Sequence, residues 1–199
     1  MVAVIAILVI LMTAGIGLLR GTGGQSRRAG VDMISGMIEQ ARTNAITSRS
    51  YVILAIAEPG DLPANDEQCR IGLFRVDEGL EDPAKPIKAT LLSRWQPLNS
   101  GIILIGGDLN GVPNPLDSPK VEITYGGAKN LSVQVRILAF NSRGGLHTPT
   151  GSTPVVLRIA EGRYLNGKPV AILRGASKVA TENLLKIGRI TARPYQIDG

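Results

Sequence analysis

The sequence contains few aromatic residues, one cysteine and one histidine. Phe, Trp and Tyr make up 4% of its 199 residues, so aliphatic side chains must fill any core. Cys69 has no second cysteine with which to form a disulfide within the chain. His147 is the single histidine, and one His with one Cys do not supply the usual ligands of a zinc site. We therefore expect a fold without disulfides and without a zinc centre.

Motifs of the common enzyme classes are also missing. The chain has no Gly-x-Ser-x-Gly nucleophile motif and no Gly-x-x-x-x-Gly-Lys-Ser/Thr phosphate loop. Residues 21–24 are too few for a phosphate loop and follow an apolar segment rather than a strand. His147 lies in a loop rich in Gly, Thr and Pro, with no Ser or Asp placed for a catalytic triad. We predict that the protein is not an enzyme and uses no cofactor.

Two loops carry oxygen-bearing side chains of the kind that bind cations. Residues 77–82 include four carboxylates, and residues 108–111 read Asp-Leu-Asn-Gly. The first spacing does not match the twelve-residue EF-hand loop. A calcium site at residues 77–82 remains an alternative, but a solvated turn is the favoured interpretation for both loops.

The first 19 residues, MVAVIAILVILMTAGIGLL, contain no charged side chain, and Thr13 is their single polar one. As a helix they would be about 28 Å long, close to the roughly 30 Å hydrocarbon core of a bilayer. A cleaved secretory signal is an alternative, although no basic residue precedes the apolar run. The interpretation as a buried helix of a soluble core is less favoured, because such helices usually keep a polar face. We predict a transmembrane helix in residues 1–24.

Residues 25–199 are predicted to form a globular domain with a helix at 27–50 and strands in 51–199. The helix is indicated by apolar residues at steps of three and four, which define one face. These residues are Ile34, Met37, Ile38, Ala41, Ala45 and Ile46. The glycines at 21, 23 and 24 should bend or locally melt the helix before this point.

Short apolar segments separated by turn residues predict an antiparallel sheet rather than repeated βαβ units. The alternating residues 131–137 are the clearest strand and should pair with 121–125 across Gly126 and Gly127. The fold class is therefore α+β, with a long N-terminal helix packed on an antiparallel sheet. The predicted strands are 51–57, 69–76, 88–95, 102–105, 121–125, 131–137, 155–159, 169–173 and 184–191.

The order of these segments resembles the type IV pilin family, and the start MVAVIAIL is similar to the end of its prepilin signature. In that signature Met1 would match the methionine of phenylalanine-threonine-leucine-valine-glutamate-leucine-methionine-valine. The leader, the cleavage-site glycine, the methylated phenylalanine and the glutamate of the signature would all precede Met1. The resemblance implies a pilin-like fold and, where an upstream leader exists, processing by a prepilin peptidase.

Residues 34–54 are similar to the GspH/FimT-type minor pilins, which carry alanine-arginine-serine, then alanine-isoleucine, then a valine-rich strand. The matching residues are Ala41-Arg42-Thr43, Ala45-Ile46 and Tyr51-Val-Ile-Leu54. An isoleucine-x-phenylalanine-asparagine-x-x-glycine segment of that family is matched by Leu138-Ala-Phe140-Asn141-Ser-Arg-Gly144. The glycine-arginine of its last strand is matched by Gly188-Arg189.

The resemblance implies a minor pilin or pseudopilin, a structural subunit of a type II secretion or type IV pilus filament. Its partners would be other pilin subunits in a hetero-oligomeric filament, and the bacterial inner membrane. The location would be single-pass, with the globular domain in the periplasm or in an extracellular filament. Small residues in the apolar helix, Ala14, Gly15 and Gly17, would allow close helix packing in the filament core.

The alternative function is a DNA-binding minor pilin for DNA uptake. The chain has a net charge of +6 and a pI of about 9.8, a balance that suits nucleic acid, an anionic surface or solubility alone. Some FimT-like proteins bind DNA through a basic C-terminal segment with glycine-arginine-x-arginine, and Gly188-Arg189-Ile-Thr-Ala-Arg193 is similar. The candidate DNA-binding residues are Lys186, Arg189 and Arg193. A solvated basic edge strand is the competing interpretation.

Overall fold

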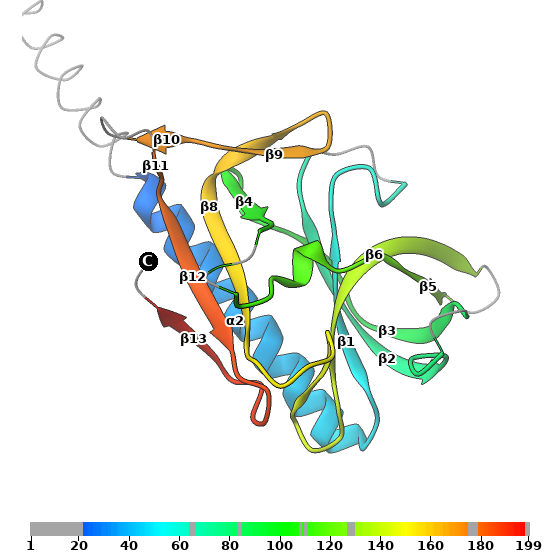
Figure 1. Cartoon of the computed structure of the whole chain (residues 1–199). Coiled ribbons are helices and arrows are strands. Elements are labelled where there is room, and N and C mark those ends of the chain that lie inside the picture. The colour runs from blue at the N-terminus through cyan, green and yellow to red at the C-terminus, as the bar shows by residue number, and fades with distance from the viewer. Residues whose placement is uncertain are drawn as a thin grey trace, which may run out of the picture.

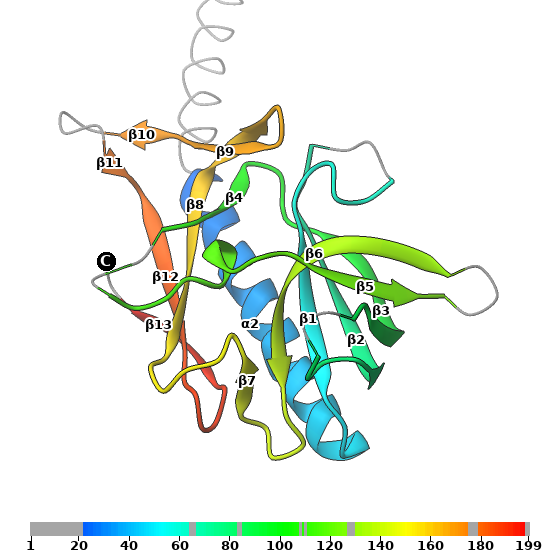
Figure 2. The same ribbon diagram turned by 45° about the vertical axis from the view of Figure 1, so that its right-hand side comes forward.

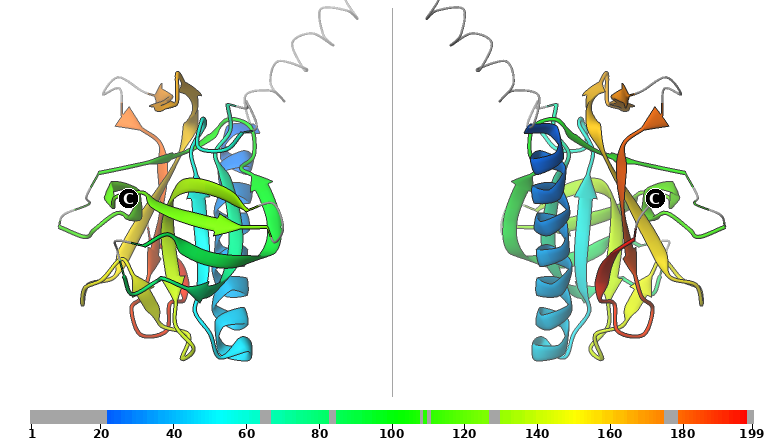
Figure 3. Two further views of the ribbon diagram at one scale, coloured as in Figure 1. Left: turned by 90° about the vertical axis from the view of Figure 1, so that its right-hand side faces the viewer. Right: turned by 90° about the vertical axis from the view of Figure 1, so that its left-hand side faces the viewer.

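The structure, a computed structural model, describes residues 22–63, 67–82, 85–107, 109, 111–126, 130–174 and 179–197. One helix, α2 (Thr22–Ser48), lies against two β-sheets (Figure 1). Figure 3 shows α2 standing beside strands of both sheets, so that one side of the helix is covered and the other faces outward. The predicted apolar segment of residues 1–19, with Ala14, Gly15 and Gly17, lies outside the described residues.

Helix α2 buries the face that the sequence predicts. Ile34, Ile38, Ala41 and Ala45 have no exposed surface, and Met37 is also buried. Ile46 is the exception, with 41% of its surface exposed. The helix ends where Arg49 adopts a positive φ of 51°, and the Ser48 hydroxyl donates a hydrogen bond to the Asn44 carbonyl oxygen.

The first sheet closes on itself. Its strands follow the order β1-β2-β3-β5-β6-β7, and β1 pairs with β6 as well as with β2. All neighbours are antiparallel except β3 and β5, which pair in parallel over two residues each. The bounds are β1 (Val52–Ala57), β2 (Arg70–Glu78), β3 (Ile87–Pro97), β5 (Val121–Tyr125), β6 (Leu131–Phe140) and β7 (Leu146–Thr148).

Strand β1 has an unbroken apolar sequence because both of its faces are buried. Val52, Leu54 and Ile56 point to the core under α2. Ile53, Ala55 and Ala57 point into the closed sheet, where they meet Phe74, Tyr125 and the inner residues of β6. Successive side chains of a strand alternate between faces, so a strand buried on both sides needs apolar residues at every position.

The second sheet follows the order β13-β12-β8-β4, with β9 paired to β8. Strands β10 (Leu173–Arg174) and β11 (Val179–Ala180) form a separate pair, and a short 3-10 helix, η1, spans Pro115–Asp117. The bounds are β4 (Ile102–Ile105), β8 (Val155–Leu165), β9 (Lys168–Ala171), β12 (Glu182–Ile187) and β13 (Pro194–Ile197).

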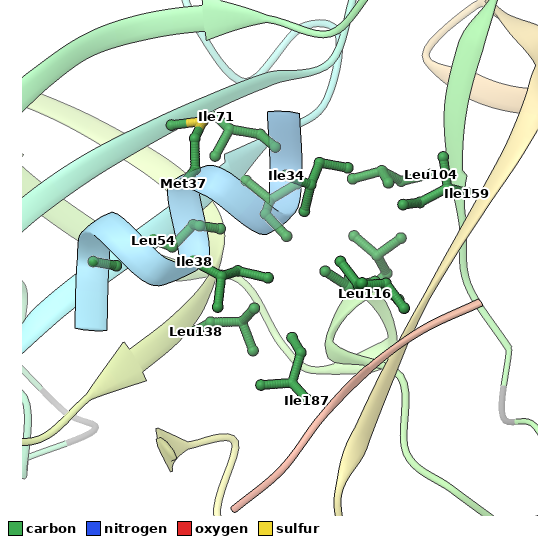
Figure 4. Packing of buried hydrophobic residues seen from close by; sticks show 14 of the residues in the cluster. Ile34, Met37, Ile38, Leu54, Ile71, Leu104, Leu116, Leu138, Ile159 and Ile187 are labelled. Atoms are coloured by element: carbon green, nitrogen blue, oxygen red, sulfur yellow. The ribbon is translucent and has the colours of Figure 1, made fainter. Parts of the chain in front are cut away.

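The main core lies between α2, the outer face of the first sheet and the inner face of the second. Ile34 and Ile38 of the helix meet Leu138 of the first sheet and Ile159 and Ile187 of the second (Figure 4). A partly buried ion pair joins the first turns of α2 to β8, with Arg27 Nη1 3.4 Å from Glu161 Oε1. The helix is thus held by burial along its length and by a charge pair near its start.

The predicted fold class is wrong. The sequence predicts a long helix, membrane-spanning in its first half, on an antiparallel sheet. The described residues instead form one helix of 27 residues and are mostly β, in two main sheets with a parallel pairing in the first. The helix also begins at Thr22 and includes Gly23 and Gly24, where the sequence predicts melting.

The same structure corrects two further predictions: a prepilin-type N-terminal helix and a single-pass location in the inner membrane. Within the described residues, no helix is long and apolar enough to cross a membrane. The physical reason is that Arg27, Arg28, Asp32 and Glu39 give α2 a charged side.

Other local predictions are confirmed. Residues 121–125 pair antiparallel with 131–135, as the glycine turn between them predicts. Residues 102–105 form a strand with the predicted bounds. The last predicted strand, 184–191, is too long at its end: β12 stops at Ile187, and a turn follows.

Candidate functional site

The turn after β6 is built by Asn141. Its side-chain Oδ1 accepts hydrogen bonds from the backbone N–H groups of Arg143, at 2.9 Å, and Gly145, at 3.0 Å. The backbone N–H of Asn141 donates to the Gly145 carbonyl oxygen, and the N–H of Gly144 donates to that of Asn141. An asparagine side chain that accepts from residues further along the chain is a common way of fixing a tight turn. The Asn-x-x-Gly pattern therefore has a structural purpose here.

Gly144 brings this turn against the end of α2. Its φ of +78° is in the left-handed region, which favours glycine. A Cβ at this position would lie 2.7 Å from Ile46 Cδ1 and 3.3 Å from Arg42 Nε. The backbone conformation thus favours glycine here, and a Cβ would require the Ile46 side chain to shift.

The turn after β12 contacts the turn after β6. The N–H of Leu146 donates to the Arg189 carbonyl oxygen at 2.8 Å, and a Cβ on Gly145 would be 3.0 Å from the Ile190 carbonyl oxygen. We call this meeting point of residues 41–46, 140–146 and 187–190 the motif junction. It unites three segments that are far apart in the sequence.

The Arg189 side chain makes structural hydrogen bonds at this junction. Its guanidinium group donates to the backbone carbonyl oxygens of Pro149, Thr150 and Thr153, and so ties down the 149–153 loop. Burial lowers the pKa of Arg189. Three of its five N–H donors are thus used within the chain.

The structure does not place the predicted DNA-binding residues on one strand. Arg189 and Arg193 both lie in the turn between β12 and β13, so their even spacing does not put them on one strand face. Arg193 is exposed, and Lys186 on β12 lies with its Nζ 5.9 Å from the centre of the half-exposed Tyr195 ring. Lys186, Arg193 and Tyr195 form the exposed basic group that remains.

A groove of about 1350 Å³ opens between the end of β2, the start of β3 and the β5–β6 turn. We call it the acidic groove, because four carboxylates and two ammonium groups line it. Its apolar lining includes Val76, Leu80, Leu91 and Leu131. The charged residues are Asp77, Glu78, Glu81, Asp82, Lys85 and Lys88.

Local ion pairs hold most of these carboxylates. Lys88 Nζ lies 2.8 Å from Glu78 Oε2 and Lys85 Nζ lies 3.1 Å from Asp82 Oδ2. The hydrogen bond from Lys88 lowers the pKa of Glu78. Glu81 accepts a long hydrogen bond, 3.5 Å, from the Tyr51 hydroxyl. Among the described residues, no group of three or more His, Cys, Asp or Glu side chains is arranged to hold a metal ion.

A second surface, the basic hairpin, consists of residues 163–173 at the β8–β9 turn and the start of β10. Leu165, Val170, Ile172 and Leu173 are between 42% and 55% exposed, and Arg163 and Lys168 are exposed beside them. Residues 162–181 contain four basic residues and no acidic one. Asn166 and Gly167 both have positive φ, the geometry of a two-residue hairpin turn. This surface was not among the predicted sites, although the Asn-Gly pair and the lack of acidic residues in 162–181 indicate it in the sequence.

The remaining reactive side chains serve the core. Cys69 is buried beside the Tyr164 hydroxyl, and burial raises the pKa of its thiol to about 12. Because the thiolate is the nucleophile, this neutral thiol is inert. Tyr164 in turn accepts a hydrogen bond from the Leu104 N–H at 3.2 Å, and burial raises its pKa. The ring of His147 packs 4.9 Å from that of Tyr51.

Comparison with known proteins identifies no family: no family model, no curated protein and no solved structure matches the chain.

Proposed function

We propose that this chain is a structural subunit of a type II secretion or type IV pilus filament, in the role of a minor pilin or pseudopilin. Neither a membrane-spanning helix nor a location in the inner membrane forms part of this role. The observation that carries the proposal is the motif junction.

The three segments that resemble the GspH/FimT-type minor pilins pack together there. Val52, after the helix motif, pairs with Phe140 of the Phe-Asn-x-x-Gly motif. Leu146, just after that motif, hydrogen-bonds to Arg189 of the glycine-arginine motif. Chance similarities have no reason to converge in space, whereas the residues of one shared structural unit must do so.

The described surfaces suit assembly better than catalysis. The acidic groove and the basic hairpin both expose apolar side chains beside charges, which is the composition of surfaces that contact other proteins. Side chains that support nucleophilic or metal chemistry are not grouped at either surface among the residues that the structure describes.

The test is made in cells that carry this gene. Surface filaments are sheared off and probed for the chain by immunoblot, and a deletion strain is scored for protein secretion and piliation. We expect the chain in the filament fraction and a loss of one of these activities on deletion. A chain that is missing from the filaments, with both activities intact in the deletion strain, contradicts the proposal.

A second role, DNA binding during uptake, is favoured by one observation. Lys186 and Tyr195 are paired residues of β12 and β13, and the exposed Arg193 lies two residues before Tyr195. Two cations beside an exposed aromatic ring are the elements of a weak, sequence-independent nucleic-acid contact. Because Arg189 is held by backbone carbonyls, this surface is smaller than the sequence predicts.

A further inference from the structure

The acidic groove and the basic hairpin lie at opposite ends of α2. Ser50 and Tyr51, which directly follow the helix, line the groove. At the other end, Arg27 pairs with Glu161, two residues before the hairpin begins, and donates to the Thr181 carbonyl oxygen. Figures 1 and 2 show β9 and β10 at the end of the molecule where α2 begins. A helix of 27 residues is about 40 Å long, so one molecule cannot bring its two surfaces together.

The two surfaces are complementary in charge and in apolar content. The groove lining carries four acidic and two basic residues, in a chain whose overall charge is +6. Three of these carboxylates are in local ion pairs, that of Asp77 with Arg75 included, so the excess negative charge of the groove is that of Glu81. The hairpin carries exposed Arg163 and Lys168, within a stretch that has no acidic residue. Each surface also exposes large apolar side chains, such as Leu131 in the groove and Val170 on the hairpin. Opposite potentials around apolar contacts favour association in one orientation.

We propose that the basic hairpin of one copy docks in the acidic groove of a second copy of this chain, head to tail. The inference rests on the proposed filament role and names the contact between subunits. Such a contact uses different surfaces on the two partners. It therefore repeats from copy to copy and forms an open chain unless the rotation closes a ring.

A second copy explains the observations better than other partners. An anionic lipid surface would attract the hairpin, but it would leave the apolar groove at the other end of α2 uncovered. A nucleic acid has no favourable charge to meet at the acidic groove. One contact between copies covers both surfaces at once.

The first experiment is cross-linking of the full chain with a flexible bis-maleimide reagent. The variant L131C/V170C carries one cysteine at each surface, while Cys69 is buried and unreactive. We expect a ladder of dimers, trimers and longer products from the double variant, and at most dimers from each single variant. The matched control, Q40C/V170C, places the first cysteine on the exposed middle of α2 and should give no ladder. Failure of the double variant to give a ladder overturns the proposal.

The second experiment reverses charges in the L131C/V170C background. R163E/K168E on the hairpin, or E78K/E81K in the groove, should lower the rate of ladder formation by about tenfold or more, because attraction becomes repulsion. The chain that carries both reversals should recover the ladder. R94E/R143E has the same change in net charge as the hairpin reversal, at exposed sites outside both surfaces, and should have no effect. Circular dichroism verifies that each variant is folded.

The proposal is overturned if the ladder forms at an unchanged rate in the single-surface reversals. It is also overturned if the chain that carries both reversals does not recover the ladder. Failure of the docking and failure of the filament role are distinguishable. A chain that is found in sheared filaments but gives no ladder retains the filament role, and the docking of hairpin in groove is refuted. A chain that gives a charge-dependent ladder but is missing from the filaments retains the docking, and the filament role is refuted.

Discussion

Gly144 lies directly against Ile46: a Cβ on the glycine would be 2.7 Å from the isoleucine Cδ1. The two residues are almost a hundred positions apart, one in a turn after β6 and the other in the last turns of α2. Their contact fixes how closely the turn approaches the helix. It explains in physical terms why the Asn-x-x-Gly motif ends in glycine here.

The first prediction is that G144A destabilises the protein by about 1–3 kcal/mol. About 1–2 kcal/mol comes from forcing a left-handed backbone on alanine, and a smaller part from displacing the partly exposed Ile46 side chain. G101A is the control, because Gly101 has a similar φ of +82° and nothing within 4 Å of its added Cβ. In urea unfolding, G101A should lose only the free energy that the left-handed backbone costs.

The crowding part is isolated by a double-mutant cycle with I46V, which removes the Cδ1 atom. In the I46V background, G144A should cost less than in the wild-type chain, although the Cγ1 atom that valine keeps, 3.2 Å from the added Cβ, leaves part of the crowding. Equal costs for G144A in both backgrounds would contradict the close contact.

The helix face was predictable because burial repeats with the helical period. Ile34, Ile38 and Ala41 are spaced so that they can only lie on one side of a helix. Ile46 fits the same period but is partly exposed, since the core ends before it. A period shows which residues share a side, but not where the opposing surface stops.

The closed first sheet was not predictable from local patterns. The pairing of β1 with β6 joins residues more than eighty positions apart, and nothing in either strand specifies the other. The unbroken apolar run 52–57 was the one local indication of this closure, because a strand of that kind is covered on both faces. A similar limit applies to the candidate site: the charge of Arg189 is visible in the sequence, but its hydrogen bonds to three backbone carbonyl oxygens are not.

The second prediction separates the two arginines of the last turn. R189Q should lower the free energy of unfolding by about 1–3 kcal/mol, because it removes charged hydrogen bonds that hold the 149–153 loop. R193Q should change it by less than about 0.5 kcal/mol, as expected for an exposed side chain. Urea denaturation of both variants measures this, and equal effects would contradict the structural role of Arg189.

The third prediction concerns pH and Cys69. The folded thiol has a pKa of about 12, against about 9 when it is not buried. Below pH 9 the thiol is neutral in both states, so stability is unaffected. Between pH 9 and 12 the unfolded thiol ionises while the folded one stays neutral, and stability falls by about 1.4 kcal/mol per pH unit. This decrease should be missing from C69A.

Unfolding midpoints at pH 8 and pH 10 test this, and the comparison is between slopes with pH, since C69A also removes packing. A thiol reagent at pH 8 gives a second measurement. Cys69 should react in urea and not in the folded chain. Fast reaction of the folded chain would show that the thiol is not buried.

The last prediction concerns DNA and uses the salt dependence of binding. Each phosphate-binding cation that a substitution removes should flatten the slope of log affinity against log salt by about 0.9 for duplex DNA. If the exposed basic group binds DNA, K186Q/R193Q should flatten the slope by about two units. R189Q/R193Q should flatten it by about one, because the Arg189 guanidinium is already occupied by backbone oxygens. R143Q, at an exposed site elsewhere, is the control. Gel retardation at low salt, followed by titration with salt, gives these slopes. A wild-type chain that does not retard DNA, or a K186Q/R193Q variant that binds unchanged, would remove the DNA-binding role and leave only the structural one.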